Sequence, residues 1–258
     1  MTSKPAWILS FTIQKGGAGK TTTVLGVGVE LAKLGAKVLL VDIDPQGNLT
    51  QALGYDPTEI EHSIYEVLLN PTQDPAFATL QSAYGVELLP ANLTLAGAEM
   101  NLTGRYGREL LLRSAINQVR NRYDYVLIDT PPSLGLLTGN ALTAADAIIV
   151  PLQAHVFALK ALPQLEQAIE IVHALNPALA IGGIVITMVD KRTSINQMVE
   201  DTARQQYGDL VFTTVIPFNI KLVEAPAVGT PISTYAPSSS GAQAYRDLAL
   251  EVAARYAR

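Results

Sequence analysis

Residues 6–22 read AWILSFTIQKGGAGKTT, a short apolar run followed by a glycine-rich turn. The apolar run is typical of a buried strand, and residues 21–34 carry apolar side chains at near-helical spacing, which predicts a helix. Glycines let the backbone approach a phosphate closely, and the free N–H groups at a helix start attract its negative charge. A glycine-rich turn between a strand and a helix therefore predicts a phosphate-binding loop.

Two side chains of this loop have the chemistry that a nucleotide needs. Lys20 can reach the β- and γ-phosphates, and Thr21 offers a hydroxyl to Mg²⁺. The usual eight-residue pattern opens with a glycine six residues before its lysine. Gln14 holds that position here and Lys15 follows it, so the loop is a variant with an extra lysine. We expect the nucleotide to contact the whole loop, namely Lys15, Gly16, Gly17, Ala18, Gly19, Lys20, Thr21 and Thr22.

Acidic residues end two further apolar runs. Residues 37–43 contain Asp42 and lead to Asp44, and residues 125–129 end at Asp129. In parallel α/β sheets, ligands bind at the carboxyl ends of the strands. We expect Asp129 to support Mg²⁺ and Asp44 to orient an attacking water, so the candidate metal residues are Thr21, Asp129 and Asp44. Asp42 receives no role from the sequence, since a polar residue often simply ends a strand.

The remaining chain alternates predicted strands and helices. Such alternation predicts an α/β fold, with a mainly parallel twisted sheet covered by helices on both faces. No linker or repeat is visible, so we expect residues 1–258 to form a single domain. The predicted strands span residues 6–13, 37–43, 86–90, 125–129, 147–152, 181–188 and 210–216. The predicted helices span residues 21–34, 108–122, 159–175 and 240–256, with Gly35 as a C-cap and a short helix capped by Ser63.

Composition excludes several classes of protein. Of the 258 residues, 48% are apolar and 16% are charged, which is the opposite of intrinsic disorder. The absence of Cys excludes Cys-ligated zinc, iron–sulfur clusters and thiol catalysis. With 18 basic and 23 acidic residues, the net charge of −5 argues against a constitutive nucleic-acid coat. No apolar run approaches the ~20 residues that span a bilayer, so we expect a cytoplasmic protein without a membrane partner.

The loop KGGAGKTT, with VDIDPQGN at residues 41–48 and VLIDTPPS at 126–133, resembles the ParA/MinD group of P-loop ATPases. The segments TMVDKRT (187–193), VIPFNIKLVEAP (215–226) and GTPI (229–232) narrow the resemblance to ParA (Soj-type) partitioning ATPases. The resemblance implies a P-loop NTPase fold that binds and slowly hydrolyses ATP with Mg²⁺. It also implies an ATP-bound homodimer in which Lys15 contacts the partner subunit's nucleotide. The catalytic residues would be Lys15, Lys20 and Asp44, and the adenine would lie among Met188, Asp190, Pro217 and Asn219.

The resemblance further implies that the ATP dimer binds DNA non-specifically at the nucleoid, and that a ParB-type protein stimulates hydrolysis. Relatives commonly read IPRN with an arginine implicated in DNA binding, whereas this chain has Phe218 at that position. The residues expected to contact DNA are Lys191, Arg192, Lys221 and Arg246. Lys160 stands where relatives often have Glu, and the sequence does not predict its effect.

A second basic segment is an alternative candidate for the DNA-binding surface. Residues 105–123 hold Arg105, Arg108, Arg113, Arg120 and Arg122 against a single acid, Glu109. We interpret the segment as the solvated face of a helix in which Glu109 and Arg113 form an i,i+4 pair. DNA binding by this segment remains the alternative.

Three other functions remain open: an ATPase that positions a non-DNA cargo, a metabolic ATP-dependent ligase, and a nucleotide-gated regulatory module. The C-terminal segment has Leu248, Val252 and Tyr256 at four-residue steps beside acidic residues. That pattern is typical of a helix packed on its own domain, because a membrane anchor needs a basic face and more apolar bulk. The histidines, His62, His155 and His173, lack metal-binding spacing, and we expect structural or solvent-facing positions for them.

Overall fold

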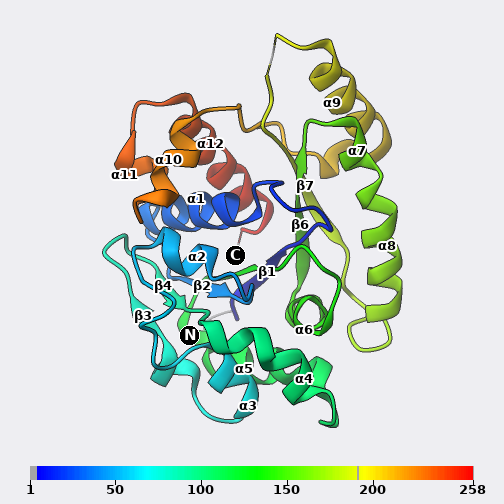
Figure 1. Cartoon of the computed structure of the whole chain (residues 1–258). Helices are drawn as coiled ribbons and strands as arrows, with labels where there is room; N and C mark the ends of the chain where they lie inside the picture. The colour runs from blue at the N-terminus through cyan, green and yellow to red at the C-terminus, as the bar shows by residue number, and fades with distance from the viewer. Residues whose placement is uncertain (1–4, 191, 258) are drawn as a thin grey trace.

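The computed structural model describes residues 5–190 and 192–257 (Figure 1). Within these residues the centre is a seven-stranded sheet with the order β3-β4-β2-β5-β1-β6-β7. Every neighbouring pair is parallel except the edge pair β3–β4. The strands are β1 (Trp7–Phe11), β2 (Val38–Asp42), β3 (Leu80–Gln81), β4 (Glu87–Leu89), β5 (Tyr125–Asp129), β6 (Ala147–Gln153) and β7 (Ile181–Thr187). The predicted α/β fold with a mainly parallel sheet is confirmed.

Helices cover both faces of the sheet (Figure 1). One face packs against α3, α5, α6 and α8, and the other against α1, α2 and α12. The α-helices are α1 (Lys20–Lys33), α2 (Asn48–Ala52), α3 (Ile64–Leu69), α4 (Ala98–Leu102), α5 (Leu111–Val119), α6 (Leu136–Ala144), α7 (Val156–Leu159), α8 (Ala161–Val172), α9 (Ser194–Tyr207), α10 (Lys221–Ala227), α11 (Ile232–Tyr235) and α12 (Ser240–Arg255).

Helix α1 is held tightly between the sheet and α12 because two of its glycines permit close approach. A Cβ on Gly26 would lie 2.6 Å from the ring of Tyr245 in α12, and one on Gly28 would lie 2.6 Å from Leu40 in β2. Real Cβ atoms do not come this near to other heavy atoms, so these contacts require glycine. The position of α1 matters because the phosphate-loop segment leads directly into it.

The predicted strand over residues 210–216 is wrong. This segment makes a single isolated bridge, from Val211 to Ile184 of β7, and a second bridge joins Pro217, just after it, to Val189. Between the bridges the N–H groups of Thr213 and Thr214 donate to the Glu251 carboxylate in α12, at 2.8 and 2.7 Å. A backbone whose donors are taken by a side chain cannot form a ladder, so the sheet ends at β7.

Helix boundaries differ from the predictions in two places. The expected helix over residues 108–122 is α-helical only in α5, with a 3-10 turn at each end (Arg108–Leu110 and Arg120–Arg122). The expected helix over residues 159–175 is divided at Lys160 into α7 and α8. The cap at Ser63 is confirmed, because its Oγ accepts from Tyr65 N and its N–H donates to Glu66. Gly35 follows α1 with a φ of +92°, as expected for a C-cap.

Candidate nucleotide site

The glycine-rich turn connects β1 to α1 and leaves the start of α1 open. Gly17 and Gly19 have φ values of +69° and +85°, a left-handed conformation that suits glycine. Gly19 is the N-cap of α1, and no side chain caps the helix there. The first N–H groups of a helix have no partner within it and carry the positive end of the helix dipole. The turn therefore presents backbone donors suited to an anion.

The carbonyl groups of the same turn are tied to the protein interior. Thr187 Oγ1, at the end of β7, donates to Ala18 O at 2.9 Å. Thr23 Oγ1 donates to Gly19 O at 2.6 Å and lies 3.3 Å from Tyr245 Oη. These bonds hold the turn from behind, from β7 and from α12. The sequence alone does not predict that Thr23 and Tyr245 support the site, because their contacts arise from packing between distant segments.

Acidic side chains of two adjacent strands meet beside the turn. Asp42 and Asp129 are register partners in β2 and β5, and both are fully buried. Thr21 Oγ1 donates to Asp129 Oδ2 at 2.6 Å. Burial, followed by the charge of Asp42, raises the pKa of Asp129 well above its ordinary value. Burial also raises the pKa of Asp42 to about 6, against hydrogen bonds that lower it.

This group of side chains fits a magnesium ion. The second carboxylate oxygen of Asp129, Oδ1, is buried and accepts no hydrogen bond from the residues that the structure describes. Buried polar atoms normally have partners, so an unpaired carboxylate oxygen beside a threonine hydroxyl fits a cation or its water. Mg²⁺ prefers oxygen ligands and commonly uses only one or two protein groups beside phosphate oxygens. Thr21 and Asp129 provide such groups.

Lys20 and Asp44 complete the polar wall of the site. A cavity of about 440 Å³ is lined by the turn, by Asp44 and by residues of α10. Lys20 is buried with its Nζ donating to Lys15 O at 3.3 Å. Burial lowers the pKa of Lys20, while Asp129 and Asp44 oppose that shift. Asp44 Oδ1 accepts from Gln46 N at 3.0 Å, so its second oxygen is available to the cavity.

Lys15 occupies a different place from Lys20. It is half-buried at the start of the turn, and burial lowers its pKa. The residues lining the 440 Å³ cavity run from Gly16 to Thr22 without Lys15. Its side chain therefore does not form part of the wall of its own cavity.

A smaller cavity of about 90 Å³ adjoins the first. The two share Gly19, Thr22, Met188, Leu222 and Val223. Three of the four residues expected around the adenine, Met188, Pro217 and Asn219, line the smaller cavity. Met188 has a φ of +57°, an uncommon conformation for a residue other than glycine. The structure thus brings most of the phosphate and adenine candidates to two adjoining cavities.

Asp190 does not line either cavity. Its carboxylate accepts from Arg192 Nη2 at 2.7 Å and also from the Arg192 backbone at 3.0 Å. These hydrogen bonds hold the pKa of Asp190 at about 2.

Three of the four residues expected to contact DNA, namely Arg192, Lys221 and Arg246, are exposed or half-buried, and each has a partner in the chain. Arg192 pairs with Asp190, and Lys221 Nζ lies 2.7 Å from Glu224 and 5.6 Å from the Tyr235 ring centre. Arg246 donates to Pro237 O and to Gln243. Lys191 lies outside the described residues. Beside them, Phe218, Ile220 and Val223 are 64%, 56% and 62% exposed, so this surface combines paired charges with apolar side chains.

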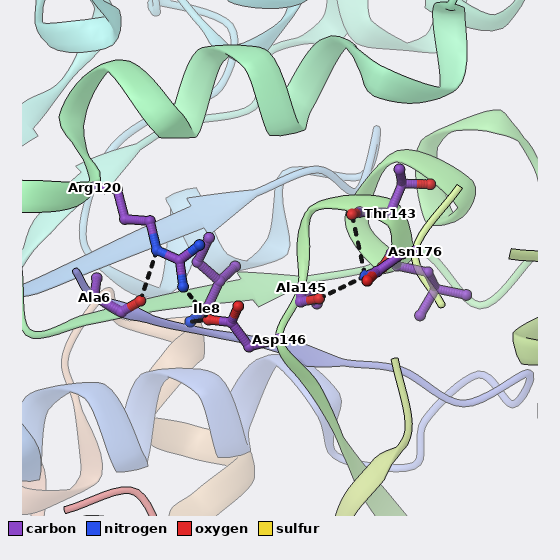
Figure 2. A network of polar contacts seen from close by, with 8 residues as sticks. Ala6, Ile8, Arg120, Thr143, Ala145, Asp146 and Asn176 are labelled. Carbon is purple, nitrogen blue, oxygen red and sulfur yellow. Dashed lines mark hydrogen bonds and ion pairs between the residues drawn. The ribbon is translucent and has the colours of Figure 1, made fainter. Parts of the chain in front are cut away.

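Arg120 of the second basic segment lies at the amino ends of β1 and β6, on the side of the sheet opposite the phosphate turn. Arg120 Nε donates to Ala6 O at 2.9 Å, and its guanidinium pairs with Asp146, which also accepts from Ile8 N (Figure 2). Figure 2 also shows Asn176 donating to the carbonyls of Thr143 and Ala145. The guanidinium is thus used to join the start of β1 to the residue before β6.

The other arginines of this segment also bond within the chain. Arg122 pairs with Asp74, and Arg105 and Arg113 donate to backbone carbonyls. The predicted i,i+4 pair is wrong, because Glu109 lies 2.9 Å from Arg108 and Arg113 donates to Leu175 O. The arginine-rich segment is therefore largely occupied by internal contacts.

The histidines lie in structural or solvent-facing positions, as expected, and His62 is exposed. His155 Nδ1 accepts from Phe157 N at the start of α7, and His173 Nε2 contacts Leu179 O at 2.8 Å. Among the described residues, no group of three or more His, Asp or Glu side chains is arranged to hold a metal.

The fold and the open, glycine-rich helix start define a P-loop nucleotide-binding protein. Comparison with known proteins agrees, since the family described as AAA domain matches residues 6–181. The sporulation initiation inhibitor protein Soj of Bacillus subtilis is 44% identical over 248 residues, covering 96% of this chain and 98% of Soj. The chromosome partitioning protein ParA of Caulobacter vibrioides is 44% identical over 260 residues, covering 99% and 97%. The chain belongs to the ParA/Soj family of P-loop ATPases.

Solved structures show the same fold. The cobyrinic acid a,c-diamide synthase of Mycobacterium smegmatis with bound ADP and magnesium has a TM-score of 0.84 at 39% identity, covering 98% of this chain and 97% of that chain. The septum site-determining protein MinD of Pyrococcus horikoshii, complexed with Mg-ADP, has a TM-score of 0.79 at 26% identity, covering 96% of both chains. Across the described parts of this chain, no helix is both long and apolar enough to traverse a membrane.

Proposed function

We propose that the chain is an ATP-dependent dimerising switch for DNA segregation, with ATP and Mg²⁺ as its cofactors and residues 1–258 as a single ATPase domain. The observation that carries the proposal is a pair of adjoining cavities between the turn and α10. The larger is lined by the free helix-start donors, by Lys20 and by Thr21, whose hydroxyl donates to the buried Asp129 carboxylate, and the smaller is lined by Met188, Pro217 and Asn219. Phosphates, a divalent cation and an adenine require these three environments in this order.

Each polar group then has a step to perform. The turn and Lys20 would hold the β- and γ-phosphates, while Thr21 and Asp129 would hold Mg²⁺, which would neutralise charge on the phosphate oxygens. Asp44 orients a water towards the γ-phosphorus. The water oxygen forms a bond to phosphorus as the bridging bond to ADP breaks, and a proton of the water passes to a phosphate oxygen or to solvent, giving ADP and inorganic phosphate. Charge that develops on the oxygens is stabilised by donors that are already in place.

The position of Lys15 supports a dimer. A lysine that does not line its own cavity is available to a nucleotide held by a second subunit placed face to face. There it adds positive charge where the transition state develops negative charge, so hydrolysis depends on dimerisation. A ParB-type protein would accelerate this slow step and thereby release the DNA.

DNA binding would use Arg192 and Lys221, with Lys191 and Arg246 beside them, and would bring the ATP dimer to the nucleoid. The ion pairs of Arg192 and Lys221 are exposed, and exposed ion pairs stabilise a protein only weakly. Phosphate oxygens of DNA can therefore displace the carboxylates without a large cost. Such binding is not specific for DNA sequence, and its affinity falls steeply as the salt concentration rises.

Electrophoretic mobility shift of a random DNA duplex, with ATP, ADP or no nucleotide, tests this function. We expect an ATP-dependent shift that Arg192→Glu together with Lys221→Glu weakens while ATP binding stays unchanged. Arg113→Glu in the arginine-rich segment is the matched control and should leave the shift unaltered. If only the control variant lost the shift, the DNA surface would lie on that segment. A shift absent under every condition would favour a non-DNA cargo.

A second candidate is an ATP-dependent amide synthase. The observation in its favour is the 39% identity to the Mycobacterium smegmatis enzyme. A synthase couples ATP cleavage to a carboxylate and an amine donor, whereas a switch hydrolyses ATP without either. Phosphate release measured with and without cobyrinic acid and glutamine or ammonia separates the two, since only the synthase would require them for turnover.

A further inference from the structure

Asp42 makes an unusual set of contacts for a residue that ends a strand. It is fully buried, and its carboxylate accepts three hydrogen bonds. Oδ1 accepts from Asp44 N at 3.2 Å, and Oδ2 accepts from both Thr50 N and Thr50 Oγ1 at 2.8 Å. The backbone of the proposed water-orienting residue is thus bonded to Asp42.

The contacts continue from Asp42 to the rest of the loop. Thr50 lies in α2 and its Oγ1 also accepts from Ala91 N at 3.0 Å, beyond the end of β4. At the near end of α2, Gly47 N donates to Asp44 O at 2.9 Å. Residues 43–47 are therefore held at both ends, at Asp44 by Asp42 and at α2 through Thr50.

A carboxylate is required for this arrangement. Its two oxygens meet donors from two directions, and both must accept. An amide offers one oxygen and would turn its NH₂ group towards one of these donors. Burying a carboxylate next to Asp129 costs free energy. An aliphatic residue at this position would therefore give a more stable protein if the strand end contributed to packing alone.

We infer that Asp42 is a positioning residue for hydrolysis: it fixes the backbone of Asp44, and Thr50 extends that hold to α2. The inference rests on the proposed role of Asp44 in orienting the attacking water. Asp42 touches neither nucleotide nor water in this scheme. It acts by limiting where the Asp44 carboxylate can lie, and a displacement of about 1 Å at a reacting group can cost on the order of 100-fold in rate.

The test compares turnover with nucleotide affinity in the full chain. Asp42→Asn should lower kcat by roughly 10- to 100-fold, on the scale of misplaced catalytic groups, while the Kd of a fluorescent ATP analogue stays within about twofold. Asp56→Asn is the matched control, because Asp56 likewise accepts from the N–H and Oγ1 of a threonine, Thr58, but is exposed. It should change neither quantity. A kcat for Asp42→Asn equal to wild type would overturn the inference.

Thr50 provides a milder pair of variants in case Asp42→Asn folds poorly. Thr50→Val removes the hydroxyl and should lower kcat, whereas Thr50→Ser keeps it and should restore turnover. Hydrogen exchange of a peptide spanning residues 42–53 should be faster in Thr50→Val than in Thr50→Ser. Equal turnover in both variants would show that the hydroxyl does not position Asp44.

A double-mutant cycle separates failure of this inference from failure of the proposed function. If Asp44→Ala alone leaves single-turnover hydrolysis unchanged, the role of Asp44 is wrong. If Asp44→Ala slows hydrolysis, Asp42→Asn should have little additional effect in that background, because there is no carboxylate left to position. An equal fold-change with and without Asp44 would mean that Asp42 acts independently, which contradicts the inference.

Discussion

Replacement of Gly26 by alanine tests how tightly the phosphate-loop helix is packed. The added Cβ would lie 2.6, 2.7 and 2.9 Å from Cγ, Cδ1 and Cδ2 of Tyr245. These ring atoms lie at the anchored end of a buried side chain, so the ring cannot swing aside. Helix α12 must then move away from α1, or the ring must leave its preferred position.

The expected destabilisation is the difference of two effects. Overpacking a core by one methyl group costs about 1–3 kcal/mol, and the anchored ring argues for the upper part of this range. Replacing glycine with alanine inside a helix stabilises the folded protein by about 1 kcal/mol. We therefore expect Gly26→Ala to lower the free energy of unfolding by roughly 1–2 kcal/mol.

The assay is urea unfolding followed by far-ultraviolet circular dichroism. Gly139→Ala in α6 is the matched control, because a Cβ there meets nothing within 4 Å. The control should gain up to about 1 kcal/mol from the same helix preference. In a Tyr245→Ala background, Gly26→Ala should also become stabilising. A Gly26→Ala protein at least as stable as wild type would refute the reasoning.

Three further predictions concern the nucleotide site. Lys20→Ala should weaken binding of an ATP analogue by on the order of 10- to 100-fold, the loss of one hydrogen bond to a charged group; unchanged affinity by fluorescence titration would contradict its assignment. Lys15→Gln should preserve that affinity but slow turnover by on the order of 100-fold, as for other lost transition-state donors; a normal phosphate-release rate would remove Lys15 from catalysis. Thr187→Val should leave Ala18 O unpaired and cost about 1–3 kcal/mol in urea unfolding, whereas Thr187→Ser should not.

The sequence predicts the phosphate turn well because its chemistry is local. Short contiguous segments of sequence determine three features: the conformation of Gly17 and Gly19, the helix start at Lys20, and the acidic strand ends at Asp42 and Asp129. Parallel strands place their carboxyl ends on one edge, so the meeting of these segments follows from the fold. What each of them contacts behind the turn does not follow, since Thr23 meets Tyr245 across 222 positions of chain.

Where the predictions from sequence are wrong or incomplete, the cause lies in tertiary packing rather than in the local sequence. Residues 210–216 have the composition of a strand, yet Glu251 from α12 takes two of the N–H groups that a strand would use. Helix α9 was not predicted because only Val199 and Ala203 of its residues are buried, which leaves little apolar periodicity. Glu109 bonds Arg108 rather than Arg113 because Arg113 finds a carbonyl after α8. In the first and third cases a distant partner outweighs a local preference, and in the second the helix lacks the apolar pattern that would predict it.

The charge distribution explains why DNA binding would depend on dimerisation in the proposed function. The chain has a net charge of −5, and Arg192 and Lys221 are each paired with a carboxylate. One protomer offers only a few such contacts to DNA phosphates, so its own affinity for DNA is low. A two-fold dimer presents the same contacts twice on one duplex, and the slope of binding against salt grows with the number of phosphates engaged. Assembly by ATP would thus convert an acidic monomer with weak DNA contacts into a binder whose affinity is lost on hydrolysis.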